Sequence, residues 1–284
     1  MDGDKLKCEQ LIQAGANIEE KDKNGDAPEL LAAGNGHYEV VELLLQNGAN
    51  INVTNSCLDP PVLWAAKNGH YEVVQLLLQK GANINAGNCY DITPVFLAAL
   101  RGHYEMVKLL LQNGANINVS NYWGNTPLIE AASNGNYEVV QLLLQKGANV
   151  NAINNYGYTP IMRAGELGFY KIVLLMLQRG AKLSTNYISK YGLKLVSCAA
   201  NDGDYEAVLF FVNLGAGVSS KTDKYGVSLI SKAAEQGCED VVKAIVEKQG
   251  ASLLSIAADD CGVEAFDFLK KTWLQPQSWF NPGC

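Results

Sequence analysis

The stretch TPLIEAASNGNYEVVQLLLQKGANVN, residues 126–151, contains two helix signals separated by a glycine. Thr126 suits the N-cap of a helix and Pro127 its first position, and apolar residues follow with helical spacing. After Gly135 a second apolar stripe begins, and it ends at Gly147, where glycine adopts the left-handed conformation at low cost. The stretch therefore predicts a short helix, a turn and a second helix, followed by a polar loop or hairpin that we call a finger.

The same pattern recurs along the chain. The Gly-Ala pair that closes the second helix recurs at intervals of 33 residues and then of 35, beginning at Gly15, Gly48, Gly81, Gly114, Gly147, Gly180, Gly215 and Gly250. One such unit cannot bury its apolar face alone, so successive units stack around a continuous core. We expect an all-α solenoid over residues 1–271, with about six full repeats and partial capping repeats at 1–19 and 250–271, followed by a tail at 272–284.

A unit of helix, turn, helix and finger in 33 residues, opened by Thr-Pro, resembles the ankyrin repeat. The resemblance is carried by the stretch quoted above and by TPVFLAALRGHYEMVKLLLQNGANIN at residues 93–118, and it covers residues 5 to about 271. No repeat keeps the family's Thr-Pro-Leu-His, so packing must replace the hydrogen bonds of that histidine. The sixth repeat also reads Lys194 and Leu195 in place of Thr-Pro, and its finger is two residues longer. We expect the carboxy-terminal third to be less regular.

Composition and charge narrow the classes of partner. A net charge of −7 and a pI near 5.1 disfavour binding to nucleic acid. No apolar run approaches the roughly 18 residues of a membrane span, and the charged residues 1–7 do not resemble a secretory signal. The seven cysteines form no C-x-x-C pair, which is typical of reduced thiols. We expect a monomeric, intracellular, cytoplasmic protein; a specialised secretion system, which leaves no such signal, would place it in a host cytosol.

The first candidate binding surface is the inner-helix groove. Residues just before and just after each Ala-Ala pair share the helix face opposite the buried alanines. Its members with side chains suited to recognition are Trp64, Arg101, Glu130 and Arg163. The resemblance to ankyrin proteins implies that this face and the finger tips bind partners. Glu130 and Arg163 occupy one position in adjacent repeats, and we expect a salt bridge across the groove in preference to a recognition pair.

The second candidate surface is a row of finger-tip residues. One equivalent position holds an aromatic residue in five successive fingers, at Tyr90, Trp123, Tyr156, Tyr191 and Tyr225, and Tyr122 and Tyr158 lie beside it. Aromatic side chains dominate binding hot spots. They also stiffen a solenoid when each ring packs on the neighbouring finger. Both interpretations stay open, and they are compatible.

Charge along the groove changes sign in the sequence. Lys67 and Arg101 lie in the first half, and the matching loops of the second half are acidic at Glu166, Asp202, Glu235, Asp259 and Asp260. A basic partner segment fits the acidic half, and a solvated acidic surface explains the same pattern.

Residues able to carry chemistry are few. His37, His70 and His103 occupy equivalent positions in stacked repeats, so neighbouring histidines lie roughly 8 to 10 Å apart. A zinc site needs each ligand nitrogen about 2 Å from the metal, which this spacing does not allow. Cys57 and Cys89 lie on neighbouring fingers without further ligands or a nearby histidine base. We expect no catalytic residue, no metal, no cofactor, no small-molecule substrate and no enzymatic activity.

These observations favour a non-catalytic adaptor, scaffold or inhibitor that binds another protein through its groove and finger tips. By resemblance alone, near-identical asparagine-rich repeats also suggest a host-directed effector of an intracellular pathogen or virus. Two alternative hypotheses remain. In the first, the chain is a targeting arm for catalytic or degradation machinery, and residues 272–284 form either a short motif or a folded cap. In the second, the chain is a substrate of an asparaginyl hydroxylase, since the repeated GANIN and GANVN segments are similar to such sites at Asn52, Asn85, Asn118 and Asn151.

Overall fold

The structure, a computed structural model, describes residues 4–184, 186–216, 229–230, 233–234 and 236–249. These ranges contain fourteen helices, and no strand is formed within them. The chain divides into two compact units, which we describe separately. Unit 1 comprises residues up to Arg163 together with Leu175–Ala181, and unit 2 comprises Ala164–Leu174 and the residues from Lys182 onward. The helix content confirms the predicted all-α repeat fold.

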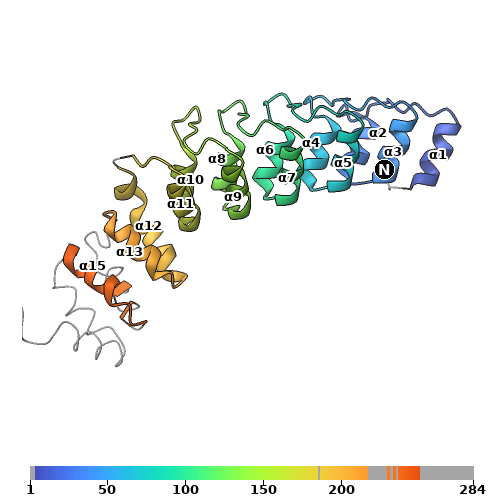
Figure 1. Cartoon of the computed structure of the whole chain (residues 1–284). Coiled ribbons are helices and arrows are strands. Elements are labelled where there is room, and N and C mark those ends of the chain that lie inside the picture. The colour runs from blue at the N-terminus through green and yellow to red at the C-terminus, as the bar shows by residue number, and fades with distance from the viewer. Residues whose placement is uncertain (1–3, 185, 217–228, 231–232, 235, 250–284) are drawn as a thin grey trace, which may run out of the picture. The chain divides into compact units, whose positions relative to one another are not determined.

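Unit 1 is a row of antiparallel helix pairs preceded by one helix (Figure 1). Its helices are α1 (Lys5–Gln13), α2 (Pro28–Gly34), α3 (Tyr38–Gln46), α4 (Pro61–Asn68), α5 (Tyr71–Gln79), α6 (Pro94–Arg101), α7 (Tyr104–Gln112), α8 (Pro127–Ser133) and α9 (Tyr137–Gln145). The inner helices α2, α4, α6 and α8 pack on one another in sequence, and each packs on the outer helix that follows it. Helices α10 (Pro160–Leu167) and α11 (Tyr170–Gln178) carry residues of both units.

Local signals account for the helix boundaries in unit 1. Proline stands at the first turn of each inner helix, and the Thr126 hydroxyl accepts a hydrogen bond from the Ile129 amide at 3.3 Å. Gly147 follows α9 with φ of 89°, the left-handed conformation that glycine adopts without strain. These features confirm the boundaries predicted from residues 126–151.

The core of unit 1 consists of alanines and branched apolar residues from the inner helices. Leu30, Leu63, Phe96 and Ile129, which replace the histidine of the family pattern, are all buried. Packing therefore replaces the missing hydrogen bonds, as expected. The fingers, residues 16–27, 49–60, 82–93, 115–126 and 148–159, are loops built from turns, and in Figure 1 the loops lie along one edge of the helices.

Unit 2 contains a longer inner helix. Helix α12 (Tyr187–Asn201) packs on α13 (Tyr205–Asn213), and α13 packs on α15 (Glu239–Gln249). The lengthened sixth finger predicted from sequence is wrong, because α12 begins at Tyr187 and takes in most of that segment. Tyr187, Tyr191 and Leu195 are spaced four residues apart, so they form one apolar stripe, and all three are buried.

The predicted caps lie at the two ends of the chain. Helix α1 stands alone before the first pair and packs on α3. The predicted carboxy-terminal cap, residues 250–271, and the tail, residues 272–284, lie outside the described residues.

Candidate functional site

The fingers of unit 1 are fixed by a side-chain oxygen at the same place in each loop, which belongs to Asp22 in the first finger and to an asparagine in the next four. In the last finger the Asn154 side-chain oxygen accepts hydrogen bonds from the amides of Tyr156 at 3.0 Å and Tyr158 at 2.8 Å. Asn121 does the same for Trp123 and Asn125. A side chain that bonds its own backbone two and four residues ahead closes a tight turn. The tip residue, whose own amide makes the first of these bonds, therefore has its backbone held in place.

Hydrogen bonds also join each finger to the next. The Tyr122 amide donates to the Tyr90 carbonyl at 2.9 Å, and the Asn155 amide donates to the Trp123 carbonyl at 3.1 Å. The same spacing links Ser56 to Asn24. Neighbouring fingers are thus fixed in register, and equivalent tip residues lie side by side.

This register places aromatic rings on the surface. The rings of Tyr90 and Trp123 are stacked, with centroids 5.6 Å apart and an interplanar angle of 16°. Tyr122 meets Trp123 edge to face at 5.9 Å. Tyr122 is 68% exposed and Tyr156, one finger further on, is 66% exposed. We call these four residues, Tyr90, Tyr122, Trp123 and Tyr156, the aromatic surface. The stacking of Tyr90 on Trp123 agrees with the interpretation that the rings stiffen the solenoid, and binding by the exposed rings stays a prediction.

The row is shorter than the sequence predicts. Tyr191 is only 7% exposed and meets Tyr187 edge to face with ring centroids 5.2 Å apart, because its segment is helical rather than a finger. Its assignment as a finger-tip binding residue is wrong. Tyr225 lies outside the described residues. The described aromatic surface ends at Tyr156.

Two other predicted residues, Tyr158 and Arg163, form a contact beside the aromatic surface. The Arg163 guanidinium lies over the Tyr158 ring, 5.4 Å from its centroid, and its Nε donates to the Ser133 hydroxyl at 3.3 Å. Cation–π contacts of this kind hold both side chains in a defined orientation. Arg163 is half-buried as a result.

Glu130, on the inner helix before Arg163, is hydrogen-bonded to the finger that precedes its own helix. Its carboxylate accepts a hydrogen bond from the Asn125 side chain at 2.8 Å. Burial raises the pKa of Glu130, and the Asn125 hydrogen bond and the Arg163 charge act to lower it. The Arg163 charge therefore acts on Glu130, and the salt bridge between the two side chains stays a prediction.

The rest of the groove in unit 1 combines apolar and cationic side chains. Trp64 is half-buried and its indole N–H donates to the Asp59 carboxylate at 3.2 Å. Leu97 and Leu100 are half-buried on α6, and Lys67 and Arg101 are exposed at the ends of their helices. In unit 2, Asp202 of the predicted acidic half pairs with Lys171 at 3.3 Å and accepts a hydrogen bond from the Tyr170 hydroxyl at 3.0 Å. Glu235, Asp259 and Asp260 lie outside the described residues.

The histidines bridge consecutive repeats. His70 Nε2 lies 3.0 Å from the Gly34 carbonyl oxygen, and His103 Nε2 lies 3.2 Å from the Lys67 carbonyl oxygen. Both carbonyls belong to the end of the preceding inner helix, where the helix leaves carbonyl oxygens without partners. His37 is the N-cap residue of α3. In the part of the chain that the structure describes, no group of three or more His, Cys, Asp or Glu residues could hold a metal.

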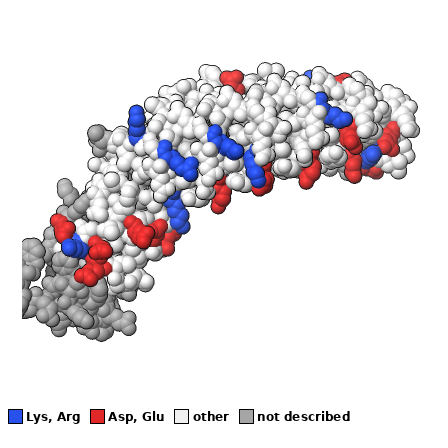
Figure 2. Space-filling view, viewed as in Figure 1, with Lys and Arg blue, Asp and Glu red and all other residues white. Residues whose placement is uncertain are grey.

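Acidic side chains lie at the first turns of the outer helices of unit 1, away from the fingers. Figure 2 shows acidic side chains in a row along one edge, and each outer helix from α3 to α9 has a glutamate in its first turn. The glutamates of these first turns are Glu39, Glu72, Glu105 and Glu138. The helix dipole favours a negative charge there, so a structural cause accounts for the row.

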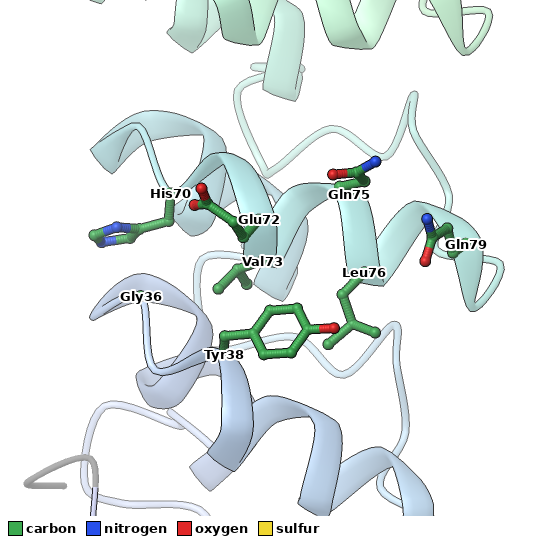
Figure 3. Close-up of a pocket in the computed structure, with 8 residues that line it drawn as sticks. All are labelled: Gly36, Tyr38, His70, Glu72, Val73, Gln75, Leu76 and Gln79. Atoms are coloured by element: carbon green, nitrogen blue, oxygen red, sulfur yellow. The ribbon is translucent and has the colours of Figure 1, made fainter.

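A hollow of about 510 Å³ lies between α3 and α5. Figure 3 shows Tyr38 reaching toward Leu76, with Glu72, Gln75 and Gln79 along α5. His70, at its rim, is already hydrogen-bonded to Gly34. The hollow therefore combines polar side chains with the apolar surface of Tyr38, Val73 and Leu76.

Sequence reasoning missed one buried charged residue. Glu29 on α2 occupies the position that is Val62 in α4 and Val95 in α6, and it is 1% exposed. Neither carboxylate oxygen has a hydrogen-bond partner. Burial, and secondly the nearby Glu19, raises the pKa of Glu29 to about 8. The signal was present in the sequence as a single charge at an otherwise apolar repeat position.

Among the described residues, none of the helices has both the length and the hydropathy that crossing a bilayer requires. A search of curated proteins found no match. The sequence model described as ankyrin repeats (3 copies) matches residues 1–88, 30–121 and 95–187. Proteins built from ankyrin repeats generally act as protein–protein interaction modules. Since these matches cover about two thirds of the chain and the helix pairs follow the same 33-residue period, this protein belongs to the ankyrin-repeat family.

Proposed function

We propose that unit 1 binds another protein without catalysis, through the aromatic surface and the adjoining groove. The observation that supports this most is the exposure of Tyr90, Tyr122, Trp123 and Tyr156 on fingers whose backbones are already fixed. Rings held in this way lose little conformational freedom on binding. Exposed aromatic residues of this kind are typical of hot spots.

The groove indicates the chemistry of the partner. Leu97 and Leu100 offer apolar area, and Lys67 and Arg101 add positive charge near it. We expect the partner to place apolar side chains against α6 and acidic side chains near these cations. Association should then slow as salt increases, because complementary charges mainly accelerate encounter.

Affinity capture from eukaryotic cell lysate, with identification by mass spectrometry, tests the proposal. A Tyr90→Ala, Trp123→Ala, Tyr156→Ala variant is compared with wild type, and a Tyr38→Ala, Tyr104→Ala variant provides the control. Tyr38 and Tyr104 are exposed tyrosines on outer helices, away from the fingers. Each hot-spot aromatic typically contributes 2 kcal/mol or more, about thirtyfold in affinity.

The recovered partner is then purified and titrated directly. We expect the finger variant to lose binding and the outer-helix control to keep it. Equal binding by both variants would place the interaction elsewhere. Loss of binding in the control alone would move it to the outer helices.

Cellular location and a host-directed role are further proposals. We propose an intracellular, cytoplasmic protein that acts as an adaptor, scaffold or inhibitor, delivered to a host cytosol if it is an effector. Microscopy of the tagged chain in its source cell and in a host cell tests the location. The targeting-arm alternative predicts that catalytic or degradation machinery is recovered in the same capture experiment.

The asparagine side chains proposed as hydroxylation sites also have a structural function in the repeats. The oxygens of Asn52, Asn85 and Asn118 accept hydrogen bonds from backbone amides of the next repeat, at 2.9 to 3.1 Å. A hydroxylase would have to approach residues that already join two repeats. Intact mass after expression in eukaryotic cells tests this alternative, since added oxygen on these residues would support it.

A further inference from the structure

Two cysteines lie side by side on neighbouring fingers of unit 1. Cys57 and Cys89 are both exposed free thiols, and the Cys89 amide donates a hydrogen bond to the Cys57 carbonyl at 2.9 Å. A backbone N–H···O=C bond of this length, with standard bond lengths on either side, places the Cα atoms of its two residues roughly 5 to 6.5 Å apart. Disulfides span Cα separations of roughly 4.4 to 6.8 Å. The two cysteines thus meet the distance requirement without movement of either finger.

The two thiols also act on each other electrostatically. Packing around the sulfur, then the Cys57 thiol and the Asp59 carboxylate, raises the pKa of Cys89. The Cys57 thiol therefore lies close enough to Cys89 to influence its ionisation.

Both backbones are held by the finger asparagines. The Asn55 oxygen accepts from the Cys57 amide at 2.9 Å, and the Asn88 oxygen accepts from the amide of Tyr90, next to Cys89, at 3.0 Å. A second link between these asparagines runs through Asp59, which accepts from the side chains of Asn88 at 2.9 Å and Asn55 at 3.4 Å. The pair is preorganised on two loops that cannot easily separate.

We propose that Cys57 and Cys89 form a reversible intramolecular disulfide by exchange with a low-molecular-weight disulfide of the glutathione type. This redox site is independent of the proposed interaction function. It lies at the end of the finger-tip row, since Cys57 occupies the position that is Tyr90 in the next finger.

The exchange proceeds in two steps. The Cys57 thiolate attacks one sulfur of glutathione disulfide, the sulfur–sulfur bond breaks, and one glutathione thiolate leaves and takes up a proton. The Cys89 thiolate then attacks the Cys57 sulfur of the mixed disulfide, and the second glutathione leaves as a thiol. Two protein thiols are oxidised and one glutathione disulfide is reduced. Cys57 attacks first because the raised pKa of Cys89 lowers its thiolate fraction.

Peptide mapping of the whole chain tests the proposal. The reduced protein is equilibrated with glutathione and glutathione disulfide at several ratios, quenched with an alkylating reagent and digested with trypsin. Cleavage after Lys23, Lys67, Lys80 and Arg101 places the two cysteines on separate peptides, 24–67 and 81–101. We expect these peptides to become linked, with the loss of two hydrogens, and to separate again in excess reduced glutathione.

Several results would overturn the proposal. Separate glutathione adducts on both cysteines without a link would exclude the disulfide, and so would links that mainly involve the other five cysteines. In single variants, we expect Cys57 in Cys89→Ser to gain a glutathione adduct faster than Cys89 in Cys57→Ser. The opposite order of rates would contradict the assigned order of attack.

A register control uses the preceding pair of fingers. Ser56 and Asn24 are joined by the equivalent backbone hydrogen bond, at 3.3 Å. A Cys57→Ser, Cys89→Ser, Asn24→Cys, Ser56→Cys variant should also form a link if finger register brings the sulfurs together. Failure of this variant to link, with the wild type linked, would show that the side-chain environment of Cys57 and Cys89 is also required.

Discussion

Tyr156 and Tyr191 occupy equivalent places in the repeat, yet one is exposed on a finger and the other is buried in a helix. Residues 154–160 read NNYGYTP, and the corresponding residues 189–195 read SKYGLKL. Both segments share Tyr-Gly at the centre. They differ in the asparagine that closes the finger turn and in the Thr-Pro that starts the next helix.

The difference shows which residues make a finger. Asn154 bonds two amides of its own loop, whereas the matching Ser189 lies within α12. Leu195, in place of Pro160, extends an apolar stripe back to Tyr191 and Tyr187. Once the asparagine that closes the turn and the Thr-Pro that starts the helix are absent, apolar residues spaced four apart favour a helix over a loop. The tyrosine is then buried instead of presented.

Removing each tyrosine gives the largest expected contrast. We expect Tyr191→Ala to lower the free energy of unfolding by about 3 to 5 kcal/mol, since it empties a core site packed against Tyr187. Tyr156→Ala should change it by no more than about 0.5 kcal/mol, because that ring is on the surface. Urea unfolding followed by circular dichroism measures both. A similar cost for the two variants would contradict the difference in burial.

The sequence predicted the regular part of the fold well. Residues 126–151 carry their own caps, glycines and apolar period, so local signals and tertiary packing agree there. The placement of Tyr90, Trp123 and Tyr156 at finger tips was right because their loops keep the asparagine and the Thr-Pro, and the role of these residues in binding stays a prediction. The prediction failed at Tyr191 because it followed the alignment of the repeats and overlooked the helical spacing of apolar residues within that segment. Glu29 was missed although it is a single charge at a repeat position that is otherwise apolar, because the burial that makes it unusual depends on its neighbours.

Glu29 and Val62 form a second pair of equivalent positions in unlike states. A carboxyl group normally titrates near 4.5, and burial raises the pKa of Glu29 to about 8 in the folded protein. The folded state holds the proton more tightly than the unfolded state does. The stability that protonated Glu29 provides is therefore complete below about pH 4.5 and is lost as pH rises toward 8.

Thermal unfolding from pH 5 to 8 measures this loss. Each unit of pKa difference corresponds to about 1.4 kcal/mol, so on the order of 3 kcal/mol should be lost across that range. Glu29→Gln should remove this part of the pH dependence. Glu29→Val should remove it and also raise stability at pH 8. The exposed Glu39→Gln is the control, and an unchanged pH dependence in Glu29→Gln would contradict the assignment.

The finger turn itself gives a smaller effect. Asn154→Ala removes the two amide hydrogen bonds and the 2.7 Å bond to the Asn125 side chain. We expect a loss of about 2 to 3 kcal/mol, at roughly 1 kcal/mol for each bond. Hydrogen exchange of the Tyr156 and Tyr158 amides should accelerate in the same variant. Asn155→Ala, which removes one bond to Tyr122, should cost about 1 kcal/mol or less. If Asn154→Ala cost no more than this control, the turn would not depend on its asparagine.

The smallest effect concerns equivalent positions where different residues make the same contact. His70 bridges to the Gly34 carbonyl at 3.0 Å, and Asn136, at the same place two repeats later, donates to the equivalent Leu100 carbonyl at 3.1 Å. Because either side chain can donate to that helix end, His70→Asn should change stability by no more than about 0.5 kcal/mol, whereas His70→Ala should cost about 1 kcal/mol. Comparing the two variants by urea unfolding separates the hydrogen bond from the ring. A cost for His70→Asn equal to that of His70→Ala would mean that packing of the imidazole, rather than its donor, joins the repeats. Tyr156 and Tyr191 show one residue type in two environments, whereas His70 and Asn136 are two residue types that make one contact. The contact is retained because the helix backbone leaves a carbonyl oxygen that needs a donor, and either side chain can supply that donor.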